Sequence, residues 1–102
     1  MTRLADRVLK VRSKNAGPFW LTVDIFCGNT DTFEAVKRQL ATAAVCALYG
    51  VEEADILRFD MADLQVIKFS FPRPTIQGNR DDRDMHGASY ACLLEELELP
   101  AN

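Results

Sequence analysis

The sequence predicts an α+β protein in which one long helix covers one face of a mainly antiparallel sheet. Three observations support this fold class: strand-like segments flank a Gly-Pro turn near the N-terminus, a long segment of helical periodicity follows, and further strand-like segments come after it. Strands joined by short turns pair in antiparallel fashion, and a helix with one apolar stripe needs a sheet face to cover. The 102 residues, 48% hydrophobic and 26% charged, are typical of a single folded domain, residues 1–102.

The first strand is predicted over residues 8–13. This segment is also open to a helical interpretation, because Leu4, Val8 and Val11 fit one helix face. A strand is favoured because it would form a hairpin with the strand-like segment that follows.

The second strand is predicted over 19–26 and alternates between an apolar face and a mixed face. Asp24 lies on the mixed face, between Thr22 and Phe26. Because an ionised carboxylate must be hydrated or paired, this position favours an exposed sheet face, with a ligand pocket or a subunit contact as the alternative. The apolar face consists of Phe19, Leu21, Val23 and Ile25.

One long helix is predicted over 32–49. Asp31 followed three residues later by Glu34 is a capping-box pattern, and Gly50 suits the left-handed end of a helix. Between these signals, apolar residues recur at steps of three and four, so one stripe faces the sheet. The stripe consists of Phe33, Val36, Leu40, Ala43 and Ala47.

Two shorter strands are predicted over 56–59 and 64–71, and Pro72 ends the second because proline cannot donate to a ladder. Residues 75–86 are predicted to form a loop. The carboxylates and His86 in this loop are metal-ligand types, but interleaved arginines and the lack of an EF-hand spacing favour a solvated, internally paired loop. The remaining predicted elements are a helical turn over 88–92 and a closing strand over 93–99.

The overall charge and the apolar runs exclude two function classes. The formal net charge is −3, and no basic stripe with interleaved aromatic residues occurs, which argues against a nucleic-acid binder. No apolar run approaches the roughly 20 residues that cross a bilayer. We therefore expect a cytoplasmic protein that binds neither nucleic acid nor membrane.

The three cysteines, Cys27, Cys46 and Cys92, form no Cys-x-x-Cys pair and signal neither disulfides nor zinc. Each lies among apolar neighbours, which predicts buried structural thiols. Cys92 with His86, six residues before it, is the one weak candidate for a nucleophile with a base. We expect no metal and no cofactor.

The densest group of polar residues precedes the second strand. Arg12, Ser13, Lys14 and Asn15 lie next to Gly17, in a segment with turn chemistry. One interpretation is an anion site, because such side chains and the N–H groups of a tight turn can gather around one anionic group. The other is a polar hairpin loop with no ligand.

The block Arg-Ser-Lys-Asn-Ala-Gly-Pro-Phe at 12–19 resembles that of a family of small bacterial domains of unknown function. That family resembles in turn the small C-terminal domain of acyclic terpene utilisation (AtuA-like) proteins, which carries an Arg-Ser-Gly-Asp-Lys-Gly-type block and has a ferredoxin-like α+β fold. The resemblance covers nearly the whole chain. It continues through Leu21-Thr22, Asp24-Ile25, Tyr49-Gly50-Val51, Pro72-Arg73-Pro74, Asp82-Arg83-Asp84 and Gly87-Ala88.

The resemblance implies a small accessory subunit that works with a large AtuA-like partner in catabolism of acyl-CoA, terpenoid or organic-acid substrates. In that interpretation the subunit lends donors to a shared site for a carboxylate or a CoA phosphate. No catalytic residue is implied. The expected ligand-binding residues are Arg12, Ser13, Lys14, Asn15 and Gly17, joined by Arg83 and Asp84 if the second loop lies at the same end of the sheet.

Two other interpretations stay open. The chain is alternatively a self-contained small lyase or isomerase acting as a homo-oligomer, with Lys14 as base or electrostatic clamp and Asp24 or Asp84 as proton carrier. The other is a purely structural interaction module.

Overall fold

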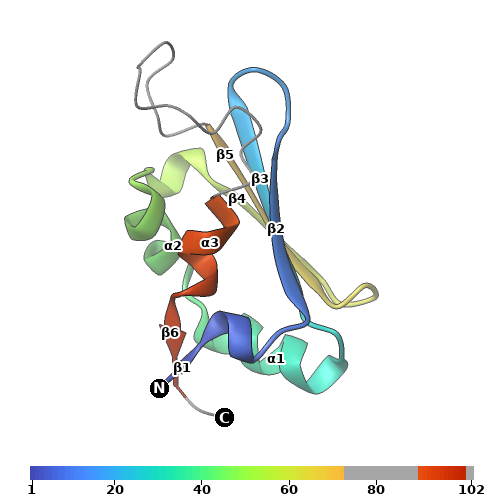
Figure 1. Ribbon diagram of the computed structural model, residues 1–102. Coiled ribbons are helices and arrows are strands. Elements are labelled where there is room, and N and C mark those ends of the chain that lie inside the picture. Colours follow the sequence, from blue (N-terminus) through green and yellow to red (C-terminus); the bar gives the residue numbers. More distant parts are fainter. Residues whose placement is uncertain (73–89, 101–102) are drawn as a thin grey trace.

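The computed structural model describes residues 1–72 and 90–100 (Figure 1). These residues form a four-stranded antiparallel sheet in the order β2-β3-β5-β4, a two-stranded antiparallel sheet of β1 and β6, three α-helices and two short 3₁₀ helices. The α+β class and the antiparallel sheet are therefore confirmed. The elements are β1 (Thr2–Arg3), β2 (Lys10–Asn15), β3 (Trp20–Phe26), α1 (Thr30–Gln39), α2 (Thr42–Tyr49), β4 (Leu57–Met61), β5 (Val66–Pro72), α3 (Tyr90–Glu95) and β6 (Glu98–Leu99), with 3₁₀ turns at Leu4–Asp6 and Glu53–Asp55.

The helices lie on one side of the four-stranded sheet, and no described element covers its other side (Figure 1). The core lies between the helices and the covered face of the sheet. Leu21, Val23 and Ile25 of β3 alternate toward this core, as the sequence predicts, and each is fully buried. Phe69 and Phe71 of β5 do the same.

The strands that flank the helices form a split βαβ arrangement. β3 and β4 are each antiparallel to β5, which lies between them, so β3 and β4 run parallel. The helices α1 and α2 connect these two parallel strands across one face. The remaining edge strand, β2, precedes β3 and pairs with it as a hairpin.

The prediction of one continuous helix over 32–49 is wrong, because Leu40 and Ala41 are extended and separate α1 from α2. The reason lies on β4, where Arg58 points at the break. Its Nη1 donates to the carbonyl oxygen of Leu40 (2.6 Å) and its Nη2 to that of Lys37 (3.1 Å). These are carbonyls that the last turn of a helix leaves without an intrahelical partner. Arg58, from a strand distant in the sequence, therefore stabilises the C-terminal end of α1, and apolar periodicity does not predict this end.

Two further helix and strand predictions need correction. The residue that caps α1 is Asn29, whose Oδ1 accepts a hydrogen bond from the Thr32 backbone N–H (2.8 Å), and not Asp31. The closing strand predicted over 93–99 is confined to Glu98–Leu99, because the helical segment extends to Glu95. The predicted loop over 75–86 lies outside the described residues.

None of the helices in the described part of the chain combines the length and the apolar character that crossing a membrane requires.

Candidate functional site

The four polar residues next to Gly17 all belong to β2, which extends to Asn15, two residues past the predicted end of the strand at Ser13. Side chains of a strand alternate between its two faces, so Arg12 and Lys14 lie on the uncovered face, whereas Ser13 and Asn15 lie on the helix-covered face. On that covered face the Ser13 hydroxyl oxygen accepts a hydrogen bond from the backbone N–H of Ala91 in α3 (2.9 Å). The four residues are therefore not gathered in the hairpin loop, although Arg12, Ser13 and Lys14 all line one hollow.

The hairpin loop itself is short and runs from Ala16 to Phe19. The Ala16 N–H donates to the Trp20 carbonyl oxygen (2.9 Å) across it. Gly17 has a φ of +85°, a value that L-residues rarely adopt, and a Cβ placed there would meet no atom within 4 Å. Gly17 is thus required by the shape of the turn rather than by a close neighbour.

The uncovered face brings Arg12 and Lys14 together with residues of the central strand. In the register of the sheet, Arg12 lies opposite Asp24 and Lys14 lies opposite Thr22. Lys68 of β5 lies on the other side of Asp24. A hollow of about 260 Å³ opens at this place, and the residues that line it are Arg12, Ser13, Lys14, Asp24 and Phe26.

Two oxygen atoms on this face are buried without a hydrogen-bond partner, namely Thr22 Oγ1 and Asp24 Oδ1. Thr22 is only 6% exposed although it lies on the uncovered face. Most buried polar atoms in proteins are paired, and each exception calls for an explanation. An oxygen left in this state costs about 1–3 kcal/mol of stability. The two unpaired oxygens therefore mark this part of the face as different from an ordinary solvated sheet surface.

The uncovered face is also positively charged. The register places the side chains of Lys10, Arg12, Lys14 and Lys68 on it, with Asp24 as the single carboxylate among the strand residues of that face. This excess of three positive charges contrasts with the net charge of −3 for the chain. A local concentration of one sign of charge attracts ligands of the opposite sign, so the face favours an anion.

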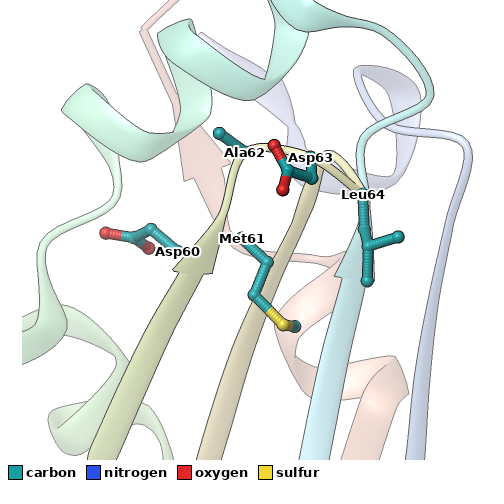
Figure 2. A pocket seen from close by; sticks show the side chains of 5 residues that line it. All are labelled: Asp60, Met61, Ala62, Asp63 and Leu64. Carbon is teal, nitrogen blue, oxygen red and sulfur yellow. The ribbon is translucent and has the colours of Figure 1, made fainter.

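A second hollow, of about 500 Å³, lies at the turn between β4 and β5 (Figure 2). Figure 2 shows that the side chains of Asp60 and Leu64 point away from each other across this turn. Asp60 already pairs with the Arg58 guanidinium (2.9 Å). Because its polar groups do not converge, this hollow is a weaker candidate. Its lining consists of Asp60, Met61, Ala62, Asp63 and Leu64.

The thiols do not contribute to the hollow. Cys27 and Cys46 are buried, as predicted, but Cys92 is exposed, so the expectation that all three are buried is wrong. Burial raises the pKa of the Cys27 thiol to about 11, which keeps it protonated at neutral pH. Within residues 1–72 and 90–100, no three His, Cys, Asp or Glu side chains form a group that could hold a metal ion.

Three of the expected residues fall beyond what the structure describes. Arg83 and Asp84, expected to join the site, lie in 73–89, as does His86, the suggested base for Cys92. Conversely, Phe26 lines the hollow although it is not among the expected residues, and Thr22 and Lys68 lie next to Asp24 on this face without lining the hollow. The alternation of β3 and β5 places Thr22 and Lys68 on the polar face, but local patterns do not predict the register that sets Lys68 opposite Asp24.

The fold and the hollow together define a small α+β domain with one cationic, uncovered sheet face. Residues 4–98 match the model of the family described as Domain of unknown function (DUF4387), and the chain belongs to this family. Searches of curated proteins and of solved structures found no significant match.

Proposed function

We propose that this chain is an accessory subunit that binds a small organic anion on its uncovered sheet face. In this proposal it works with a larger AtuA-like protein in the catabolism of acyl-CoA, terpenoid or organic-acid substrates. The observation that carries the anion site is the hollow shared by Arg12, Lys14 and Asp24 on a face with an excess of positive charge. The partner rests on the sequence resemblance and on the apolar surface described below.

The two cations suit a carboxylate. A guanidinium can hold a carboxylate through two parallel hydrogen bonds, and an ammonium adds a compact charge beside it. None of the ion pairs in the described part of the chain involves Arg12 or Lys14, so both are available to a ligand. The volume of about 260 Å³ falls below the roughly 300–1,000 Å³ of pockets that enclose drug-sized ligands. A small carboxylate therefore fits better than an entire CoA molecule.

Exposed apolar side chains on the same face support a partner. Trp20, Leu57 and Phe59 are 40%, 52% and 46% exposed, and all three point away from the helices. Apolar patches that stay exposed commonly mark protein contacts. A partner seated over Leu57 and Phe59 of β4 that also extended across β5 would reach the hollow between β2 and β3 and exclude water from it, which strengthens the interaction of the cations with an anion.

The arrangement of β3, α1, α2 and β4 around β5 supports the relation to AtuA-like small domains. A split βαβ unit is part of the ferredoxin-like fold that the resemblance implies, and these elements have that form. In this chain the strand at the edge beside β3 is β2, which comes before β3 in the sequence.

The anion site is tested by titrating the isolated chain with propionate and following backbone amide chemical shifts by NMR. We expect saturable shifts in β2 and β3, and we expect Arg12→Gln to weaken binding about tenfold or more, since a hydrogen bond to a charged group contributes ~1.5–3 kcal/mol. The matched control is Lys10→Gln, which removes the same charge from the same face outside the hollow. Equal loss in both variants, or no saturable shift, would reject the anion site.

The partner is tested by co-expressing the chain with a tagged AtuA-like protein from the same organism. Retention of the chain through size-exclusion chromatography is expected, and Phe59→Lys on the uncovered face should abolish it. As the control, Leu93→Lys changes an exposed apolar residue of α3, away from that face. A chain that never associates with the AtuA-like protein would reject this part of the proposal.

A self-contained lyase or isomerase is the second candidate, because Lys14 and Asp24 line the same hollow. A carboxylate and an amine that line the site of one bound molecule can exchange protons with it in turn. Turnover of an organic acid by the purified chain alone, abolished in Lys14→Ala, would favour the enzyme. Binding without turnover across such acids would favour the accessory subunit.

A further inference from the structure

The central strand of the uncovered face has two acceptors that lack donors. Thr22 Oγ1 and Asp24 Oδ1 are both buried and without partners. The two residues are separated by one position on β3, so their side chains lie on the same face about 7 Å apart along the strand. An ionised carboxylate only accepts hydrogen bonds, whereas a hydroxyl both accepts and donates. Asp24 therefore has the stricter need for a donor.

The neighbouring cations do not supply that donor. Arg12 and Lys68 lie on either side of Asp24 in the register. Yet neither of them forms an ion pair with it among residues 1–72 and 90–100, where the ion pairs are Arg3–Asp6, Arg3–Glu96, Lys37–Glu34 and Arg58–Asp60. The cationic groups of Arg12 and Lys68 and the carboxylate of Asp24 thus lie on adjacent strands without forming an ion pair.

A simple anion would neutralise the cationic side chains of this hollow but would not donate a hydrogen bond to Asp24. Its negative charge would suit Arg12 and Lys14, but it would approach Asp24, and like charges at short range repel each other. A ligand that also carries a donor group would satisfy the carboxylate and compensate this repulsion. Facing Cα atoms of antiparallel strands are about 4.5–5.5 Å apart, so the anionic group and the donor group must be close together in the ligand.

We infer that the hollow between β2 and β3 binds a small carboxylate with a hydroxyl or ammonium group on the carbon next to its carboxylate. The carboxylate lies over Arg12 and Lys14, and the donor group lies over Asp24, with Thr22 next to Asp24 on the same face of β3. This inference rests on the proposed function, because it names the ligand class of the same site. The shared chemistry is that of a short hydroxy acid or amino acid.

The test compares ligands that differ only in the donor. Lactate and alanine each share their carbon skeleton with propionate, which has no donor. In NMR titrations of the intact chain, we expect lactate or alanine to bind at least tenfold more tightly than propionate. Asp24→Ala should reduce that ratio to near one while propionate binds as well as before or better, because the repulsion is gone. Thr22→Val should reduce the ratio less, since it removes the more adaptable of the two groups.

Asp24→Asn distinguishes the two donor types. The amide keeps an acceptor oxygen and loses the negative charge, so a preference for lactate persists, whereas a preference for alanine falls to near one. Equal binding of lactate, alanine and propionate by the unmodified chain would overturn the inference and leave the proposed anion site intact. Absence of binding for all three would overturn the proposed function itself. A preference for lactate or alanine that Asp24→Ala does not change would also overturn the inference.

Discussion

The two faces of the four-stranded sheet differ in how their polar side chains are hydrogen-bonded. On the covered face, the guanidinium of Arg58 has four hydrogen-bond acceptors, and the hydroxyls of Ser13 and Tyr49 bond to backbone atoms of α3. On the uncovered face, Thr22 and Asp24 each keep a buried oxygen without a partner. Polar groups on the covered face thus hold secondary-structure elements together, whereas these two oxygens of the uncovered face bond to no other described element.

The largest effect is expected from Arg58→Met, which tests whether the covered face depends on its polar contacts. This change leaves Asp60 unpaired and removes the donors to the carbonyls of Leu40 and Lys37. Because Asp60 is exposed, the loss comes mainly from the hydrogen bonds that the charged guanidinium donates to these carbonyls, and such bonds contribute ~1.5–3 kcal/mol. Urea unfolding followed by circular dichroism should show a loss of about this size. Arg38→Met, at an exposed position of α1, should change stability by less than about 0.5 kcal/mol.

If Arg58→Met were as stable as Arg38→Met, the break between α1 and α2 would have another cause. The contrast between the two faces would then lose its strongest support.

A smaller effect is expected from Tyr49→Phe, which removes one hydrogen bond and keeps the ring. The Tyr49 hydroxyl donates to the Tyr90 carbonyl oxygen (2.6 Å), and its ring stacks on Phe71 with centroids 5.0 Å apart. Losing one such bond costs ~1 kcal/mol. The same variant also bears on pH dependence. Thermal unfolding at neutral pH measures the loss, and an unchanged melting temperature would mean that this bond does not hold α3.

Burial raises the pKa of the Tyr49 phenol above its usual value of 10.0. The unfolded chain therefore releases this proton at a lower pH than the folded chain does. The contribution of the neutral phenol is complete below pH 10 and is lost as the pH rises above 10. Between pH 9 and pH 11, the unmodified chain should lose more stability than Tyr49→Phe does. Parallel urea curves at both pH values give the difference, and equal losses would contradict the buried phenol.

Local sequence patterns predict some features of the fold, and long-range contacts decide others. The α+β class and the strands over 10–15, 20–26, 57–61 and 66–72 follow from local alternation, and the structure confirms their existence with shifts of a few residues. The helix break did not follow, because its cause is Arg58, eighteen residues beyond Leu40. Long-range contacts of this kind leave no local pattern.

The candidate site shows the same limit. Arg12, Lys14 and Asp24 were recognised as unusual from their residue types alone. Arg12 and Lys14 were expected in one anion site, but the sheet face that they share with Asp24 was not predicted, because it depends on β2 extending to Asn15 and on the register with β3. A shift of one residue at the strand end moves each side chain to the opposite face. For this reason the hydroxyl of Ser13 accepts a hydrogen bond from α3, although Ser13 also lines the hollow.

The smallest change in stability is expected from Thr22→Val, and its sign distinguishes the uncovered face from the covered face. Substitution of a well-packed buried residue usually lowers the stability of the protein, but Thr22 has a buried oxygen with no partner. Valine has nearly the same shape and no polar atom to leave unpaired, so the variant should be as stable as the unmodified chain or more stable by up to ~1 kcal/mol. Ser13→Ala is the comparison on the covered face, where loss of the bond to Ala91 should cost about 1 kcal/mol. Urea midpoints that shift in opposite directions would establish the difference between the faces. A clear loss in Thr22→Val would show that this hydroxyl is stabilised within the fold and is not reserved for a ligand.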